Sequence, residues 1–375
     1  MIQIERLWNA ARIAAVPALL GAAFLSAHAA VAAPTPPPRY SISLAGPAPS
    51  SNQSEAGGMN AQGDVGGNSD SSASAQTFRF RQNGLIWFGS PQGTNYSFTY
   101  GINDYDDVAV AAGPDRYPLY PYLGFPHGKG VIWRQLLAPK NEKLHGTAAA
   151  INDQEDAVGY YYDGKNNAHA VIWTRADSYK PRILSVPTGT VASYVYALDN
   201  SGDSAGQSES KTVTTAAVWE ASGHRDALVP MKAGDSSAGS AVVRTSSQPV
   251  KILVGGTSGN AKVGSMAAAI WTLTPSAKPG ISQSAKPLVI PSPAGHPWCV
   301  LNGINAAGIG AGECDSYTNS IATVAIGGVQ HNLNSLIPAK SGWTLWSAKA
   351  INAKGEIAGI GSYKGQEAAF LLTPK

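Results

Sequence analysis

The chain has 375 residues, of which 43% are hydrophobic and only 14% are charged. Its 27 lysines and arginines nearly balance its 24 aspartates and glutamates, and no basic cluster is present, which argues against a nucleic-acid-binding protein. The 41 glycines, together with few charges and regularly spaced apolar segments, are typical of a secreted all-β protein rather than of a disordered chain.

Residues 1–33 are predicted to be a secretory signal peptide. An apolar core runs from Ile13 to Leu25, and two cleavage motifs of small residues follow it, ending at Ala29 and Ala32. A membrane anchor is the alternative, but an apolar core of 13 residues is shorter than the roughly 20 that span a bilayer. We therefore expect an exported protein with a proline-rich spacer at 34–39 and no membrane span after cleavage.

One short pattern recurs through the rest of the chain. It consists of an Asn or Asp in a turn and, in most copies, a glycine seven residues later. The anchor positions are Asn60, Asn103, Asn152, Asp199, Gln248, Asn305 and Asn352, of which Gln248 belongs to a degenerate copy. Successive anchors are 43 to 57 residues apart, close to the roughly 40 to 50 residues of a propeller blade with four short strands.

The turn chemistry of these units predicts a hairpin between the first and second strands. Asn60 and Asn305 are each followed at the fourth position by a glycine, Gly63 and Gly308. An Asx side chain caps a type I turn, and glycine supplies the positive φ of a bulged hairpin.

We predict an all-β fold over residues 40–375, namely a seven-bladed β-propeller of four-stranded antiparallel blades. In the fourth unit the strands are expected at 193–198, 204–207, 215–219 and 226–230. The last unit has only three strands, whereas Tyr40–Leu44 has no partner of its own. We expect this N-terminal strand to pair with 368–372 and to close the ring, because closure removes exposed strand edges.

The segments 168–173 (AHAVIW) and 368–371 (AAFL) each follow an Ile-Asn turn. With these segments the chain resembles the bacterial probable extracellular repeat family, called HAF after its His-Ala-Phe signature. The resemblance covers nearly all of residues 40–375. It implies an exported β-propeller-like repeat protein, and it brings no established catalytic residues.

The two cysteines, Cys299 and Cys314, lie on the two arms of the sixth hairpin. A two-residue loop would place them directly opposite each other, whereas a bulged loop with Gly308 as the extra residue would pair Cys299 with Asp315 and turn the thiols to opposite faces. We predict a disulfide, because an exported protein rarely keeps two nearby free thiols.

Two recurring residue types have both a structural and a functional interpretation. Trp133, Trp173, Trp219 and Trp271 are expected on third strands, either as sugar-stacking platforms or, as their periodicity favours, as packing between blades. The acidic turns 103–107 and 152–156 have Asp-x-Asp character but lack the glycine and distal glutamate of a calcium loop, so solvated turn acids are favoured. No metal, cofactor or catalytic set is predicted.

A proline-aromatic insertion at Pro114–His127 interrupts the second unit between its second and third strands. Proline-stiffened aromatic rings can bind a sugar or a protein with little loss of entropy, although the segment could also cover its own blade. The candidate ligand-binding residues are Arg116, Tyr117, Tyr120, Tyr122, Phe125 and His127, with Tyr161 and Tyr317 at the equivalent loop position of other units.

The sequence therefore favours an exported binding or interaction module whose partner is a glycan or a protein. Two alternatives remain open, a polysaccharide-active enzyme and a purely structural surface protein. The enzyme is the weaker alternative because the acids are expected in the Asx turns, on the face opposite the aromatic insertion.

Overall fold

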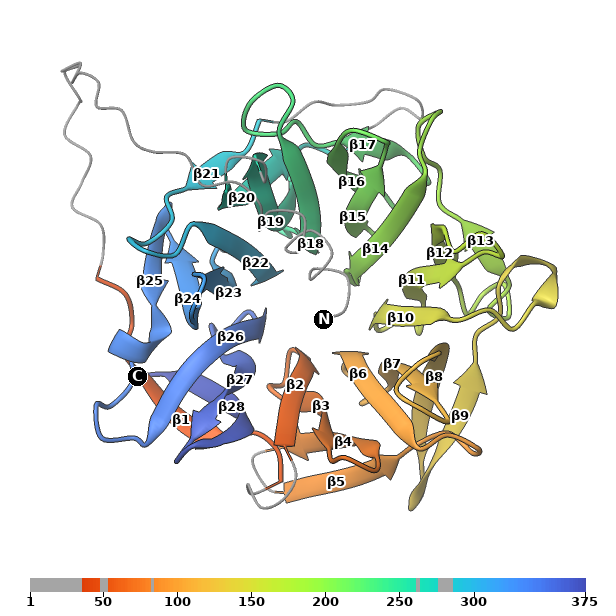
Figure 1. The fold of residues 1–375 in the computed structure, drawn as a ribbon, viewed down its shortest axis with the longest axis horizontal. Helices are drawn as coiled ribbons and strands as arrows, with labels where there is room; N and C mark the ends of the chain where they lie inside the picture. Colours follow the sequence, from red (N-terminus) through yellow and green to blue (C-terminus); the bar gives the residue numbers. More distant parts are fainter. Residues whose placement is uncertain (1–35, 48–52, 82–83, 261–263, 276–285) are drawn as a thin grey trace.

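The computed structural model describes residues 36–47, 53–81, 84–260, 264–275 and 286–375. The expected signal peptide and the start of the spacer lie outside these residues. Four-stranded antiparallel sheets are arranged radially around a centre, which is the architecture of a β-propeller (Figure 1). The described helices are two short 3-10 turns, η1 (Pro139–Asn141) and η3 (Leu333–Ser335), and neither has the length or hydrophobicity to cross a bilayer.

The strands follow the chain in groups of four. The first groups are β2 (Gln53–Met59), β3 (Val65–Asp70), β4 (Ala75–Arg81), β5 (Gly84–Gly89); then β6 (Tyr96–Ile102), β7 (Val108–Gly113), β8 (Tyr120–His127), β9 (Gly130–Gln135); then β10 (Gly146–Ile151), β11 (Ala157–Tyr162), β12 (Ala168–Trp173), β13 (Pro181–Ile183). The next are β14 (Ala192–Leu198), β15 (Ser204–Glu209), β16 (Thr214–Trp219), β17 (Arg225–Ala227); then β18 (Ser236–Arg244), β19 (Ile252–Asn260), β20 (Ser265–Leu273), β21 (Leu288–Ile290); then β22 (Trp298–Ile304), β23 (Gly310–Asp315), β24 (Ser320–Ile326), β25 (Val329–Asn332). Single parallel bridges link β4 to β6 and β20 to β22.

The last group joins the two ends of the described chain. It contains β26 (Trp343–Ile351), β27 (Ile357–Tyr363) and β28 (Gln366–Pro374), and its outermost strand is β1 (Tyr40–Leu44). The strand β1 runs antiparallel to β28, from Tyr40 opposite Pro374 to Leu44 opposite Phe370. The pairing expected from the sequence is therefore present.

The innermost strand of each group carries a bulge opposite its neighbour. The skipped residues include Tyr100, Tyr196 and Asn302. Beside these bulges two backbones approach so closely that a Cβ on Gly206 would lie 2.0 Å from the carbonyl oxygen of Tyr194. This approach explains the glycine that the repeat places seven residues after its anchor.

The anchor side chains tie neighbouring blades together as well as capping their own turns. Asn103 accepts hydrogen bonds at Oδ1 from the backbone N–H groups of Tyr105 (3.0 Å) and Asp107 (2.9 Å). Its Nδ2 donates to the carbonyl oxygen of Asn152, the next anchor, at 3.0 Å. Asn60 and Asn305 make the same donation to the anchors that follow them.

The acids of these turns also bond between blades. Asp104 accepts a hydrogen bond from the N–H of Ala61 at 2.9 Å, and Asp153 accepts one from the N–H of Asp104 at 2.8 Å. These acids are thus acceptors in an inter-blade network rather than merely solvated side chains. In the described residues, no three His, Cys, Asp or Glu side chains form a group that could hold a metal ion.

The prediction that Gln248 is the anchor of the degenerate copy is wrong. Thr245 takes this position, since its N–H donates to the carbonyl oxygen of Lys251 and its Oγ1 accepts from the N–H of Lys251. Gln248 lies inside the longer turn between them, and the close-approach glycine is Gly256. An insertion in the turn had shifted the apparent spacing.

The tryptophans pack between blades, as their periodicity favoured. Trp173, Trp219 and Trp271 lie on third strands, are almost fully buried, and each donates its indole N–H to a backbone carbonyl of the preceding blade. Trp133 is the exception, because it lies on the fourth strand β9 and is half-buried against the core group around Val108.

Candidate ligand-binding face

The two ends of the strands form two faces of the propeller. The Asx turns define one end, here called the turn face. The loops joining second to third strands, which include 71–74, 114–119, 163–167, 210–213, 316–319 and 364–365, define the other, here called the loop face. Antiparallel strands place successive connections at alternate ends, so the two sets of residues lie on opposite faces.

The proline-aromatic insertion is much shorter than predicted. The loop covers only residues 114–119, and Tyr120–His127 forms the third strand β8. The prolines in this strand lie where its ladders end: Pro121 precedes the pairing with β9, and Pro126 follows the pairing with β7. Proline is tolerated at such positions because few ladder hydrogen bonds are lost there.

The strand separates residues that the sequence had grouped in one loop. Phe125 and His127 lie towards the turn face, and the ring of Phe125 packs against that of Tyr179 with centroids 6.3 Å apart. Tyr122 packs beside the core group of β6 and β7, and its burial raises the pKa of its hydroxyl. Tyr120 begins the strand at the loop face. Of the residues predicted in this segment, only Arg116, Tyr117 and Tyr120 lie together at the loop face.

Arg116 fastens the short loop to the preceding blade. Its Nη2 donates to Asp70 Oδ1 at 2.7 Å and to the carbonyl oxygen of Ser71 at 3.0 Å. Its guanidinium lies 5.2 Å from the ring centre of Tyr96. The hydrogen bond to Asp70 raises the pKa of Arg116, so this side chain is a docked cation rather than a free contact for a ligand.

Tyr117 begins a continuous series of rings across three blades. It is 62% exposed, and its hydroxyl lies 3.3 Å from Nε2 of His145. The His145 ring stacks on Tyr162 with centroids 4.7 Å apart, and Tyr162 meets Tyr160 edge-on at 5.8 Å. Tyr160 in turn contacts two rings of β14 at 5.1 and 6.4 Å. We call this series the aromatic row; it consists of Tyr117, His145, Tyr162, Tyr160, Tyr194 and Tyr196.

The prediction that Tyr161 contacts a ligand is wrong, because its side chain is buried. Successive residues of a strand point to opposite faces, and Tyr161 points into the blade, where it is 7% exposed and its ring lies 5.3 Å from that of His169. Its neighbours Tyr160 and Tyr162 belong to the aromatic row. The alternation along β11 could have identified them, whereas His145 and β14 enter the row only through the fold.

Tyr317 does not join the row. It is 74% exposed and rests edge-on against Trp298 at 4.6 Å, in the loop after β23. That group lies across the centre from β6–β9 (Figure 1). It remains an exposed ring on the same face without a neighbour from the aromatic row.

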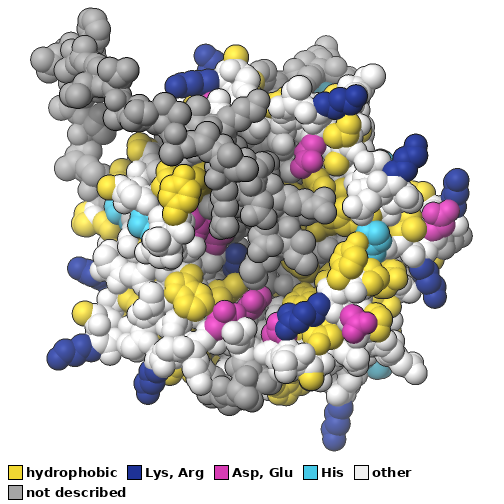
Figure 2. Space-filling model, in the orientation of Figure 1, with side chains coloured by type: hydrophobic (Ala, Val, Ile, Leu, Met, Phe, Trp, Pro, Cys, Tyr) yellow, Lys and Arg dark blue, Asp and Glu magenta, His cyan; other side chains and the backbone are white. Residues whose placement is uncertain are grey.

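Carboxyl groups also lie on the loop face, which the sequence reasoning missed. Glu55 and Glu367 stand near the starts of their strands, and Asp70 ends β3, all at this face. Burial, followed by the neighbouring Glu55 carboxyl, raises the pKa of Glu367 to about 7. Figure 2 shows acidic side chains gathered near the centre of the molecule. The expectation that acids concentrate on the opposite face was therefore incomplete.

Cys299 and Cys314 form a disulfide in the structure. Their backbones stand directly opposite each other on β22 and β23, with Cα atoms 4.1 Å apart. The turn that joins these strands is the bulged type, which alone would have offset the thiols. The second bulge at Asn302 shifts the register back by one residue.

No protein-family model matches the sequence, and no curated protein matches it. Similar solved structures include virginiamycin B lyase from Staphylococcus aureus, with a TM-score of 0.44 and 11% identity over 90% of this chain and 95% of the lyase. YCF48 from Cyanidioschyzon merolae has a TM-score of 0.45 and 10% identity over 89% and 98% of the two chains. Trypanosoma rangeli sialidase has a TM-score of 0.41 and 8% identity over 86% of this chain and 54% of the sialidase. At such scores these likenesses carry no inference about ligand or reaction.

Proposed function

We propose that this chain is an exported glycan-binding protein, built as a closed ring of seven four-stranded blades and related to the HAF repeat family. The observation that carries the proposal is the aromatic row, which begins at the exposed ring of Tyr117 and continues inward across three blades. Flat rings that are held by their neighbours offer stacking surfaces for sugars at little cost in entropy.

Contacts between the first and last groups support the closed ring. Ala56 and Phe78 of the first group share a core with Ala369 and Leu371 of β28. The hydroxyl of Ser54 accepts a hydrogen bond from the N–H of Ala369 at 3.1 Å. The disulfide of β22 and β23 supports export, because such bonds persist in oxidising compartments. Mass spectrometry of the protein from its native host should find a new N-terminus near Ala32 in the exported fraction.

A glycan array with residues 34–375 tests the binding function. We expect the double variant Tyr117→Ser, Tyr162→Ser to lose the glycan signal, since each stacked ring is worth about 0.5–1.5 kcal/mol beyond its buried area. Tyr105→Ser is the matched control, because Tyr105 is 67% exposed on the turn face. A double variant that binds like the parent would refute the aromatic row as the site.

A polysaccharide-active enzyme is the second candidate, favoured by one observation. Glu367 has a pKa raised to about 7 and lies beside Glu55 on the same face as the aromatic row. Glycoside hydrolysis uses two neighbouring carboxyl groups, of which the acid has a raised pKa, as Glu367 has. If glycans from the array are cleaved, Glu367→Gln should abolish cleavage while binding persists; an uncleaved bound glycan would exclude this candidate.

A further inference from the structure

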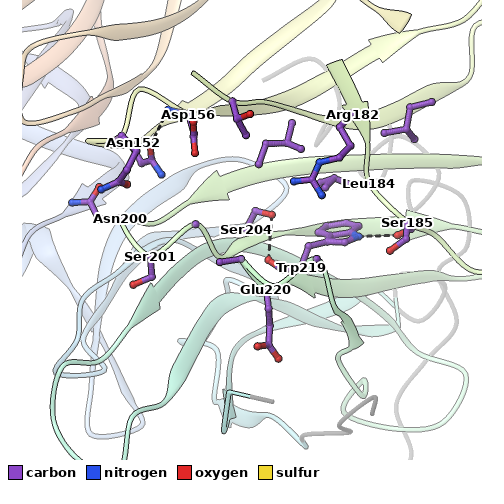
Figure 3. A pocket seen from close by; sticks show the side chains of 17 residues that line it. Asn152, Asp156, Arg182, Leu184, Ser185, Asn200, Ser201, Ser204, Trp219 and Glu220 are labelled. Atoms are coloured by element: carbon purple, nitrogen blue, oxygen red, sulfur yellow. Dashed lines mark hydrogen bonds between the residues drawn. The ribbon is translucent and has the colours of Figure 1, made fainter. Parts of the chain in front are cut away.

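A cavity lies on the turn face, away from the aromatic row. Its volume is about 500 Å³, and it opens between the group β10–β13 and the group β14–β17 (Figure 3). The Asx turns around Asn152 and Asn200 form one wall, and the residues that follow β12 and β16 form another. Cavities of this size accommodate a ligand of sugar or amino-acid size.

Arg182 is the one positively charged residue that the described part of the chain contributes to the lining of this cavity. Figure 3 shows its side chain reaching from β13 towards the cavity. Among the described residues its guanidinium makes no hydrogen bond or ion pair at bonding distance, but its charge acts on the Asp156 carboxyl, whose pKa it lowers against the effect of burial. Other arginines of the turn face are paired, as Arg175 is with Glu155 and Arg244 with Asp203 at 2.7 Å. An arginine that faces a cavity and makes no direct ion pair offers a planar fork that fits a carboxylate.

Acceptors and hydroxyls line the rest of the cavity. One carboxylate oxygen of Asp156 accepts a hydrogen bond from the N–H of Arg175 at 2.8 Å, and the side chain faces the cavity in Figure 3. The pKa of Asp156 is raised, chiefly by burial. Ser201 and Ser204 add hydroxyl groups. A ligand that donates hydrogen bonds suits this lining.

The balance of charge restricts the ligand further. The lining contains one cation, Arg182, and two acidic residues, Asp156 and Glu220. A dianion such as phosphate would be repelled by the two acids, whereas a monoanion can keep its charge at the guanidinium and turn its hydroxyl groups to Asp156. Sugar acids combine a single carboxylate with several hydroxyl groups.

We propose that this cavity binds a uronic acid, with the carboxylate on Arg182 and the sugar hydroxyls on Asp156 and Ser201. The site is independent of the glycan surface on the loop face. It would recognise a free sugar acid or the exposed end of an acidic polysaccharide by the same chemistry.

Calorimetric titration of residues 34–375 distinguishes these possibilities with five probes. Sodium galacturonate should bind more tightly than galactose, which lacks the carboxylate, and than acetate, which lacks the hydroxyls. Inorganic phosphate should bind more weakly than galacturonate. An oligogalacturonide that binds better than the monomer would identify a polysaccharide end as the source, and equal affinity would identify the free acid.

The variant Arg182→Gln should lower galacturonate affinity about tenfold or more, the usual loss for a charge-assisted pair. Lys180→Gln removes the same charge from an exposed neighbour outside the cavity and should change nothing. The melting temperature of Arg182→Gln should stay close to that of the parent, since the side chain is exposed and makes no hydrogen bond or ion pair at bonding distance with the described residues.

Galactose or phosphate that binds as well as galacturonate would overturn the proposal, as would an Arg182→Gln variant with parental affinity. The double variant Tyr117→Ser, Tyr162→Ser should retain galacturonate binding. Loss of array binding in that variant alone therefore tests the loop face, and loss of galacturonate binding in Arg182→Gln alone tests the cavity.

Discussion

At the residue scale, the side chain of each anchor asparagine makes two kinds of hydrogen bond. A carboxamide both accepts and donates, so one side chain caps its own turn and bonds to the next blade. Where Asp199 replaces asparagine, the donor is lost and the direction reverses: its Oδ2 accepts from the N–H of Arg244 at 2.7 Å. At this aspartate anchor the next blade therefore donates the hydrogen bond that it accepts elsewhere.

Asn305 offers the clearest test, because no charged residue lies in its turn. It accepts from the N–H groups of Ala307 and Ile309 and donates to the carbonyl oxygen of Asn352, all at 3.1 Å. Asn305→Ala should lower the free energy of unfolding by about 1–3 kcal/mol, since it leaves buried groups unpaired. Asn305→Asp, which keeps the acceptor, should lose less in chemical denaturation. An alanine variant as stable as the parent would contradict the role of the side chain.

Glu367 should make stability depend on pH in one window. Its pKa is raised from 4.5 to about 7, so the folded state retains a proton that the unfolded state releases. Stability should therefore fall as the pH rises from about 4.5 to about 7 and stay level above that range. Melting curves of Glu367→Gln should show a shallower decline than those of the parent, since Asp107, Asp199 and Asp315, whose pKa values are raised to about 6, still contribute to it. Glu142→Gln, at an exposed position, should keep the full decline. Parallel pH profiles for the parent and Glu367→Gln would show that the carboxyl ionises normally.

At the scale of the strand, irregularities decide which residues meet. In the hairpin of β22 and β23 the bulged turn and the bulge at Asn302 offset each other, so Cys299 faces Cys314. A strand has a period of two residues, and one extra residue reverses the face of every side chain beyond it. In addition, the bulge lets Asn302 donate to the carbonyl oxygen of Ala348 in the next blade at 3.0 Å.

Removing the disulfide should test the register of this hairpin. The bond closes a segment with a sequence separation of 15, for which loop-closure entropy gives about 3 kcal/mol. The variant Cys299→Ala, Cys314→Ala should lose about that amount in urea unfolding. Mass spectrometry of the unreduced protein should find no free thiol, and two reactive thiols would show that the bond does not form.

At the scale of the whole molecule, β1 is the outermost strand of the last group, and the proposed closed ring depends on its pairing with β28. Tyr40 is 2% exposed and belongs to a core shared with β26, β27 and β28. Deleting residues 34–46 should lower the melting temperature sharply, because it uncovers both this core and the free edge of β28. The milder variant Tyr40→Ala should cost about 3–5 kcal/mol, and Ser43→Ala, at an exposed position, almost nothing.

A peptide of residues 36–47 should restore part of the melting temperature of the deletion variant, since a free strand edge accepts an added strand. A deletion variant that melts like the parent would show that β1 contributes nothing to closing the ring.

Much of this architecture could be predicted from the sequence by itself. The period of the anchors, the Asx turns and the alternation of short apolar strands are local signals, and they predict four-stranded units and buried tryptophans. The unpaired segment at Tyr40–Leu44 and the missing strand of the last unit predict the pairing of β1 with β28. These inferences hold because turns and strand periodicity depend on neighbours in the chain.

Only the tertiary structure decided where the candidate sites lie. The prolines of β8 predicted a loop, but its pairing with β7 and β9 shows a strand with the prolines near the ends of these pairings. Tyr161 was predicted to be exposed, but the register of β11 turns its side chain into the blade. The aromatic row joins residues from three blades, and the Arg182 cavity joins two. Such sites depend on register and on the packing of one blade against another, which bulges of a single residue control and local sequence does not reveal.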